Sequence, residues 1–246
     1  MDGSIPLFCA PGDLVQVQPL RERFEIIPVS GDLEFSAERK VGGGFYLRFH
    51  DDHLTLCQGS DSNGVWVRSA DIRRRLRGEF ALARACGSNA KKRLHILDAT
   101  AGLGIDAMAL RARGNLLTLV EREPVLWALL SDLLRRLDAS DVTLDCADAM
   151  SVIAERTFYD VVYVDPMFPP RRKTALPNKR MQYLNALLGN SDVEDLTEFI
   201  YQARGIATDR VVLKRRLQDP AIVAPDWQIL GKTIRYDVFR GSRRTA

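Results

Sequence analysis

Several features are absent from this sequence of 246 residues, and each absence narrows the class of protein. No apolar run approaches the roughly 20 residues that a membrane-spanning helix needs, so we expect no membrane partner. The four cysteines are widely spaced and form no Cys-X-X-Cys pair, which argues against a disulfide framework or a zinc site. No internal repeat or low-complexity segment is evident, so a repeat architecture is not indicated.

The opening segment, MDGSIPLFCAPGDL, lacks a basic stretch followed by a long apolar one. We therefore expect no signal peptide and a cytoplasmic location. With 46% hydrophobic and 27% charged residues, the composition is that of a globular protein with one large domain and at most a small appendage. Two of the three histidines lie in HDDH at 50–53, a string that is more typical of a polar turn between strands than of a metal site.

The first part of the chain predicts a small antiparallel meander. Short alternating runs at 45–49, 54–57 and 65–69 are separated by turn-rich segments and preceded by a glycine run. A basic helix is expected over 70–87, with one apolar face formed by Ile72, Leu76, Phe80 and Ala83. We place a small N-terminal β subdomain at 1–75 and the main domain at 76–246.

In the main domain, strand patterns alternate with helical ones, which predicts an α/β fold with a mostly parallel sheet. The run at 159–166 is almost entirely apolar, as a central parallel strand should be. Two final runs joined by Gly231-Lys232 predict an antiparallel hairpin. This order favours the Rossmann-like, seven-stranded class I methyltransferase fold. The expected strands are 94–99, 116–121, 142–148, 159–166, 210–215, 227–230 and 233–239, and the expected helices are 103–113, 124–137, 149–156 and 193–207.

The first strand of that sheet leads into DATAGLGID at 98–106, which has the form of a loop that holds a nucleoside cofactor. Gly102 and Gly104 let the backbone approach a ligand closely. Asp98, Asp106 and, after the second strand, Glu121 supply carboxylates. Acids suit S-adenosylmethionine because it carries an ammonium, a sulfonium and ribose hydroxyls but no phosphate.

Two other readings of this loop remain open. Dinucleotide sites also place an acid after the second strand, but their third glycine is replaced here by Asp106-Ala107. A tight strand–helix turn without any ligand would show the same glycines. Asp148, after the third strand, can reach an adenine amine or cap the helix that follows.

The fourth strand ends at Asp165-Pro166-Met167-Phe168, which resembles the [DNS]-P-P-[FYW] loop of amino methyltransferases. A base's exocyclic amine is a poor nucleophile because its lone pair is delocalised into the ring. The Asp165 carboxylate and the Pro166 carbonyl can accept the amine hydrogens and free that lone pair, while Phe168 stacks on the base. The alternative is that Asp165-Pro166 only ends the strand and Phe168 is a core aromatic.

A net charge of +3 does not by itself indicate a nucleic-acid partner, but basic residues are clustered. Between Arg68 and Arg93 there are nine Lys and Arg against two acids. Any one cluster is more often a solvated helix face, yet those near the Asp165 loop are placed to contact phosphates. The candidate RNA-binding residues are Arg171, Arg172, Lys173, Lys179, Arg180 and Lys214.

Together DATAGLGID, LVEREPVLWALLSDLL, VVYVDPMFPPRRKTAL and RVVLKR resemble the bacterial ribosomal RNA small subunit methyltransferase J family. The resemblance covers about 78–241 and implies methylation of guanine N2 near the 3′ end of 16S rRNA, with 16S rRNA or the small ribosomal subunit as partner. It also implies cofactor contacts from Ile105, Asp106, Glu121, Arg122, Ala147, Asp148 and Asp165. Position 105 is often arginine in that family, so its side-chain role is not carried over to Ile105.

Three other functions remain in view. The loop chemistry also fits an amino methyltransferase acting on adenine N6 or on a protein glutamine. Guanine favours an acid, because its ring N1–H can donate to Asp165, whereas adenine N1 accepts. A noncatalytic rRNA-binding assembly factor and a nicotinamide oxidoreductase complete the alternatives. No obligate protein partner is indicated.

Overall fold

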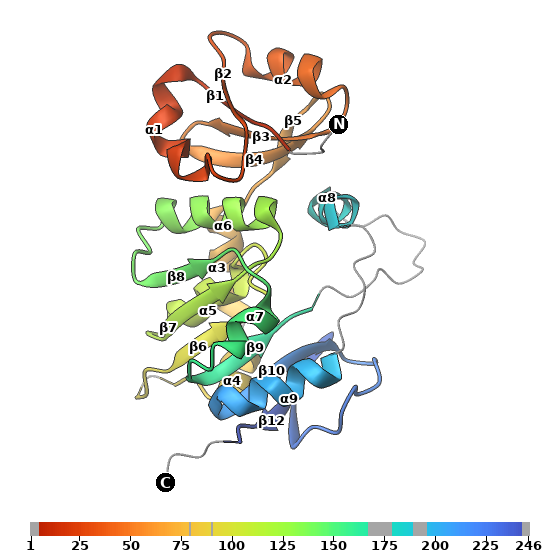
Figure 1. Ribbon diagram of the computed structural model, residues 1–246. Helices are drawn as coiled ribbons and strands as arrows, with labels where there is room; N and C mark the ends of the chain where they lie inside the picture. The colour runs from red at the N-terminus through yellow and green to blue at the C-terminus, as the bar shows by residue number, and fades with distance from the viewer. Residues whose placement is uncertain (1–4, 79, 90, 167–178, 189–195, 243–246) are drawn as a thin grey trace. The chain divides into compact units, whose positions relative to one another are not determined.

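The structure is a computed structural model that describes residues 5–78, 80–89, 91–166, 179–188 and 196–242 (Figure 1). The chain forms two compact units, which are described separately. The first comprises Met1–Val67, Glu123–Ala139 and Ala175–Leu188, and the second comprises Arg68–Arg122, Ser140–Thr174 and Gly189–Ala246. The domain boundary expected after residue 75 stays a prediction.

A five-stranded sheet in the order β2-β1-β3-β4-β5 forms the first unit's framework. The last three strands make the predicted antiparallel meander. The two others were not predicted: β1 pairs in parallel with both β2 and β3. Each has only three residues, too few for a period-2 pattern to be recognised. The strands are β1 (Leu7–Cys9), β2 (Ile26–Pro28), β3 (Phe45–His50), β4 (His53–Gln58) and β5 (Asp61–Val65).

The third strand of the meander lies four residues earlier than the prediction of 65–69. The chain turns already at Gly59, whose φ of 53° belongs to the left-handed region. At Gly64 the strand approaches β4 so closely that a Cβ would lie 2.4 Å from the Leu56 carbonyl oxygen. Backbone pairing therefore selects the polar DSNG segment as strand. HDDH is the tight turn that the sequence predicts, with positive φ at Asp51 and Asp52.

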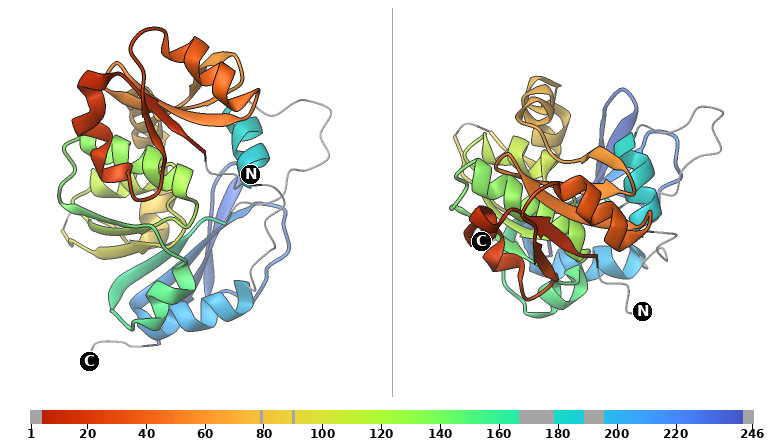
Figure 2. Two further views of the ribbon diagram at one scale, coloured as in Figure 1. Left: turned by 45° about the horizontal axis from the view of Figure 1, so that its top comes forward. Right: turned by 90° about the horizontal axis from the view of Figure 1, so that it is seen from above.

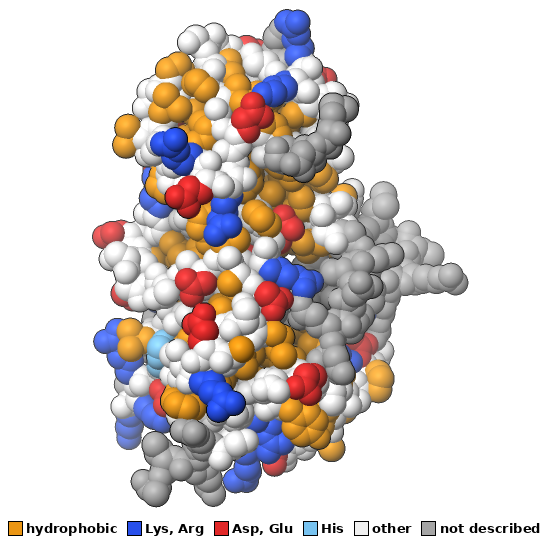
Figure 3. Space-filling model, viewed as in Figure 1, with side chains coloured by type: hydrophobic (Ala, Val, Ile, Leu, Met, Phe, Trp, Pro, Cys, Tyr) orange, Lys and Arg blue, Asp and Glu red, His pale blue; other side chains and the backbone are white. Residues whose placement is uncertain are grey.

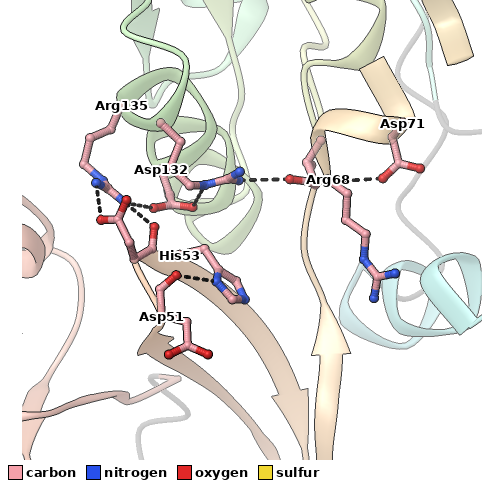
Figure 4. Close-up of polar contacts among 9 residues, drawn as sticks. Asp51, His53, Arg68, Asp71, Asp132 and Arg135 are labelled. Carbon is pink, nitrogen blue, oxygen red and sulfur yellow. Dashed lines mark hydrogen bonds and ion pairs between the residues drawn. The ribbon is translucent and has the colours of Figure 1, made fainter. Parts of the chain in front are cut away.

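The first unit's helices cover this sheet. Phe8 and Tyr46 meet edge to face at 5.7 Å within a core that also contains Ala37 of α2. Arg135 of α6 donates to Asp132 of the same helix at 3.0 Å and to Asp52 after β3 at 2.7 Å (Figure 4). The helices are η1 (Pro11–Asp13), α1 (Leu14–Val17), η2 (Gln18–Leu20), α2 (Leu33–Val41), α6 (Pro124–Arg136) and α8 (Lys179–Leu188).

A seven-stranded sheet in the order β11-β12-β10-β9-β6-β7-β8 forms the second unit and confirms the predicted fold class. Neighbouring strands from β10 to β8 pair in parallel, while β12 is antiparallel to both β10 and β11. The predicted C-terminal hairpin is thus present. The strands are β6 (His95–Asp98), β7 (Leu116–Val120), β8 (Val142–Asp145), β9 (Tyr159–Val164), β10 (Ala207–Arg216), β11 (Trp227–Leu230) and β12 (Ile234–Arg240).

Helices flank both faces of this sheet, α7 and α9 on one and α4 and α5 on the other (Figures 1 and 2). The central strand β9 is buried between them, and Val162 and Val164 pack against Phe199 and Ile200 of α9. The hydrophobic effect of this burial holds the layers together. The helices are α3 (Ser69–Gly78), α4 (Phe80–Cys86), α5 (Ile105–Arg111), α7 (Ala149–Ala154) and α9 (Leu196–Ile206).

The helix expected over 70–87 is described as two helices, α3 and α4. Ile72 and Ala83 are buried as expected, but Leu76 is 39% exposed. The prediction of one continuous apolar face was wrong at Leu76, because the side chain that α3 turns toward α5 is the neighbouring Arg75, about 100° away around the helix. The side chain of Phe80 lies outside the described residues. None of the described helices combines the length and the apolarity that crossing a membrane requires.

Candidate active site

The predicted cofactor residues gather at one edge of the second unit's sheet. Parallel strands end at the same edge, where β6 ends with Asp98, and β7, β8 and β9 are followed by Glu121, Asp148 and Asp165. The strand order reverses between β6 and β9, since the chain continues outward to β7 on one side and to β10 on the other. Ligands of doubly wound sheets bind at this switch point.

The glycine turn after β6 has the backbone that the sequence predicts. Gly102 and Gly104 have φ values of 54° and 73°, which side-chain-bearing residues rarely adopt. The amide of Gly102 donates to Glu121 Oε2 at 2.8 Å, so the acid after β7 holds the loop after β6. The glycine turn and the acid expected after the second strand are therefore in direct contact.

Asp98 is buried at the foot of this loop, with only 1% of its surface exposed. Its Oδ1 accepts from the Thr100 amide at 3.3 Å. Burial, followed by the negative charge of Asp106, raises the pKa of Asp98 well above its usual range. Asp98 is thus an acid whose charged form the fold disfavours.

Asp106, at the start of α5, is surrounded by donors from three other elements. Its carboxylate accepts from the Tyr163 hydroxyl at 2.6 Å and from Lys214 Nζ at 2.9 Å, and Arg75 Nε lies 2.6 Å from its other oxygen. Burial alone would raise the pKa of Asp106, but the charges of Lys214 and Arg75 outweigh it and hold the pKa below its ordinary value. Asp106 is therefore ionised at neutral pH.

Asp165 follows β9, and its side chain is about one-third exposed, at 33%. Its backbone amide donates to Thr100 Oγ1 at 2.7 Å, and Lys214 Nζ donates to its Oδ2 at 2.6 Å. Burial raises the pKa of Asp165, and the positive charge of Lys214 opposes that rise. One carboxylate oxygen is held by a cation at the point where the reaction loop begins, and Pro166 follows it half-buried.

Lys214 of β10 joins the two acids. Its side chain is 18% exposed, and burial alone would lower the pKa of its ammonium. The charges of Asp165 and Asp106 reverse that effect and raise the pKa, so Lys214 is a fixed cation. We expected Lys214 to contact RNA, and that role stays a prediction. Its ion pairs place it within the carboxylate cluster.

The remaining cofactor candidates lie around this cluster. Asp148 is exposed and caps α7 by accepting from the Met150 amide at 2.8 Å, the alternative role that its position suggests. Ile105 opens α5, Arg122 is exposed after Glu121, and Ala147 is half-buried before α7. Their contacts with a cofactor stay predictions.

The other predicted RNA-binding residues lie in the first unit or outside the described residues. Lys179 and Arg180 lie in α8 of the first unit, where Lys179 Nζ is 2.5 Å from Asp61 and Arg180 donates to the Trp66 carbonyl at 3.4 Å. The others, together with the proposed stacking residue, lie outside the described residues. These are Phe168, Arg171, Arg172 and Lys173.

Sequence reasoning missed three residues of the cluster. Tyr163 has the form of an ordinary core aromatic in an apolar strand, and Thr100 that of a loop residue. Arg75 lies in a run of arginines, and nothing in that run singles it out. Each is defined by contacts between segments distant in sequence, which local patterns do not encode.

The site's chemistry fits S-adenosylmethionine. At the positive-φ Gly102 the loop is open to close approach, since among the described residues a Cβ there would meet only the Thr100 carbonyl, at 3.9 Å. The surrounding groups are acids, which match a ligand with an ammonium, a sulfonium and two ribose hydroxyls. Among the described residues, no group of three or more His, Cys, Asp or Glu is arranged to hold a metal ion.

The reversed strand order, the C-terminal hairpin and an acid-lined glycine turn define a class I S-adenosylmethionine-dependent methyltransferase. Residues 34–241 match the family model described as "Putative SAM-dependent methyltransferase". The chain belongs to this family and, within it, to the ribosomal RNA small subunit methyltransferase J family, as the curated relatives show. Its cofactor is S-adenosylmethionine, which excludes the nicotinamide alternative.

Three ribosomal RNA small subunit methyltransferases J illustrate the similarity. The protein of Alkalilimnicola ehrlichii is 41% identical over 192 residues, which cover 72% of this chain and 70% of that protein. That of Rhodopseudomonas palustris strain TIE-1 is 41% identical over 177 residues, which cover 67% of this chain and 85% of that protein. That of Alcanivorax borkumensis is 37% identical over 207 residues, which cover 78% of this chain and 83% of that protein.

Solved structures agree with the fold. A SAM-dependent methyltransferase from Neisseria gonorrhoeae superposes with a TM-score of 0.71 at 27% identity, covering 96% of both chains. The 16S rRNA N2 G1207 methyltransferase of T. thermophilus, solved with AdoMet and guanosine, has a TM-score of 0.50 at 16% identity. It covers 81% of this chain and 50% of that one, and it supports the fold alone.

Proposed function

We propose that this protein transfers a methyl group from S-adenosylmethionine to the exocyclic N2 amine of a guanosine near the 3′ end of 16S rRNA. The observation that carries the proposal is the placement of Asp165. Its carboxylate stands at the carboxyl end of β9, next to the cofactor loop, with one oxygen bound to Lys214. The relatives' names, which specify small-subunit rRNA, support the substrate class.

The proposed reaction needs an acceptor more than a strong base. The cofactor supplies the methyl group, which leaves sulfur as the N–C bond forms. Asp165 and the Pro166 carbonyl would accept the hydrogens of the amine, localise its lone pair and point it at the methyl group. The nitrogen becomes acidic on methylation, so its extra proton can pass to Asp165 or to water.

An acid at position 165 favours guanine over adenine in this proposal. Guanine offers N1–H and the N2 amine side by side, two donors that a carboxylate can accept together. Adenine offers an acceptor at N1, which a carboxylate would repel. Lys214 supports the same choice because its positive charge favours the ionised, acceptor-only form of Asp165.

Contacts with the rest of the RNA complete the proposal. Phe168 would stack on the extruded base, and Arg171, Arg172, Lys173, Lys179 and Arg180 would hold flanking phosphates. Removing the ring in Phe168→Ala should weaken RNA binding by about 1–3 kcal/mol, as base–aromatic stacking does elsewhere. Affinity for S-adenosylmethionine should stay unchanged, and an equal loss in both would refute the stacking role.

The proposal is tested by nucleoside analysis of 16S rRNA from cells that lack the gene. Complementation with the wild-type gene should restore one N2-methylguanosine per 16S rRNA, while the Asp165→Ala gene should restore none. Restoration of N6-methyladenosine instead would keep the enzyme class but overturn the base assignment. Restoration of N2-methylguanosine by Asp165→Ala would remove Asp165 from the catalytic residues and overturn the observation on which the proposal rests.

A further inference from the structure

Helix α3 is anchored beside the carboxylate cluster by one of its arginines. Arg75 Nε lies 2.6 Å from Asp106 Oδ1, and Arg75 Nη2 lies 3.5 Å from the Tyr236 hydroxyl. Ile72, three residues earlier on the same side of the helix, is buried. These contacts fix α3 against the site within the second unit, and both Arg75 and Asp106 are largely buried at 17% and 15% exposure.

The opposite side of α3 carries three more arginines. At 100° per residue, Arg73, Arg74 and Arg77 point away from the side occupied by Ile72 and Arg75. All three are exposed, and the Arg74 side chain remains 79% exposed although it lies 3.2 Å from Asp71. We call Arg73, Arg74 and Arg77 the α3 arginine face.

We infer that the α3 arginine face binds phosphates of the RNA strand that carries the target base. The inference rests on the proposed function, since it takes an RNA as substrate. Guanidinium groups suit this partner because their planar donors match phosphate oxygens in a bidentate way. Because Arg75 reaches Asp106, and Asp106 shares Lys214 with Asp165, the helix borders the place where the target base must enter.

The charge pattern of α3 favours a ligand over solvent as its partner. Arg73 and Arg77 are one turn apart, where like charges destabilise an isolated helix. The acid of the helix, Asp71, is already engaged at its N-terminus, where it accepts from the Arg68 amide at 3.1 Å (Figure 4). On the face shown in Figure 3, by contrast, basic and acidic side chains are interspersed. An anionic partner would relieve the repulsion along α3.

A matched control exists at the other edge of the same sheet. Lys91 and Arg93 are exposed and precede β6, so they lie at the amino ends of the parallel strands, away from the carboxylate cluster. The double variants Arg73→Gln/Arg77→Gln and Lys91→Gln/Arg93→Gln remove the same charge. Neither pair contacts the carboxylate cluster in the described structure.

The experiment measures methyl transfer to small ribosomal subunits, and binding of a 16S 3′-domain RNA fragment without cofactor, over a range of salt. The α3 variant should raise both KM and the RNA Kd at least tenfold, with kcat and the S-adenosylmethionine Kd within twofold of wild type. Its plot of log Kd against log salt should be shallower by about 1.4, since each single-strand phosphate contact contributes ~0.7. The control variant should match wild type.

Equal effects of the two variants on KM, Kd and salt dependence would overturn the inference while leaving the proposed function standing. The experiment also distinguishes failure of the proposed function from failure of the inference. If wild type methylates no rRNA but its binding to the fragment depends on Arg73 and Arg77, the proposed function fails and the arginine face stands. A loss of kcat at saturating RNA would show that the variant acts on chemistry instead and would contradict the inference.

Discussion

Lys214 Nζ lies 2.6 Å from Asp165 Oδ2, and the same ammonium lies 2.9 Å from Asp106. A single cation on β10 therefore holds together the acid that begins the reaction loop and the acid in the first turn of α5. Because opposite charges at this distance in a partly buried site stabilise each other strongly, the position and ionisation of Asp165 depend on Lys214.

Replacing Lys214 by methionine should lower kcat by about a hundredfold, since small misplacements of a reacting group have effects of that order. The pKa of Asp165, already raised by burial, should rise further, so the acidic limb of the kcat–pH profile should move to higher pH. The Lys214→Arg variant should keep most of the wild-type kcat and most of the wild-type pH profile, because arginine retains the positive charge. Lys232→Met, in the exposed turn after β11, is the control. An unshifted profile in Lys214→Met would contradict the positioning role.

Replacing Asp165 by alanine should abolish methyl transfer without unfolding the protein. The residue lies at the end of β9 and is not part of the apolar core, so circular dichroism and the unfolding midpoint should change little. Wild-type turnover by the variant would remove Asp165 from the catalytic set. Asp165→Asn is the informative partner, since it keeps an acceptor oxygen but loses the charge; we expect partial activity.

The Glu121→Gln variant should weaken S-adenosylmethionine binding about tenfold, because a charge-assisted hydrogen bond contributes about 1.5–3 kcal/mol. The Glu121 carboxylate also accepts from the Gly102 amide at 2.8 Å, and glutamine keeps an acceptor oxygen for this bond but loses the charge that strengthens it. Isothermal titration measures the Kd. Glu123→Gln makes the same chemical change two residues later, where the acid caps α6, and should leave the Kd unchanged. Similar losses of S-adenosylmethionine affinity in the two variants would point to a general loosening of the loop and contradict a specific role of Glu121.

The Asp98→Asn variant should be more stable than wild type at pH 8, and the difference should shrink toward pH 4. The folded-state pKa of Asp98 is raised, so wild type loses stability as pH rises above the unfolded value of about 3.9. Asparagine keeps the acceptor for the Thr100 amide but does not titrate. Each unit of pKa difference corresponds to ~1.4 kcal/mol. Chemical denaturation at both pH values measures the effect, and a pH-independent difference would refute it.

The sequence predicted the second unit well because its signals are local. The apolar run of β9 and the glycines at 102 and 104 each encode their own local structure. The carboxyl-end acids followed from strand order, since parallel strands end at one edge. Thus Asp98, Glu121, Asp148 and Asp165 could be placed before any contact was known.

The first unit and the ion-pair network were harder to predict. Strands as short as β1 and β2 are defined by pairing partners distant in the sequence, and the position of β5 depends on how closely Gly64 can approach β4. The neighbourhood of positive charge suggested an RNA contact for Lys214, which stays a prediction, but it did not indicate the ion pairs of Lys214 with Asp106 and Asp165. Which charges meet across a fold is a tertiary property that a linear pattern does not contain.

The most direct test of the central claim is transfer of tritium from labelled S-adenosylmethionine to small ribosomal subunits from a strain lacking the gene, followed by nucleoside analysis. The account predicts label in N2-methylguanosine with wild type and none with Asp165→Ala. Label in another nucleoside, or no transfer by a protein that demonstrably binds the cofactor, would contradict it.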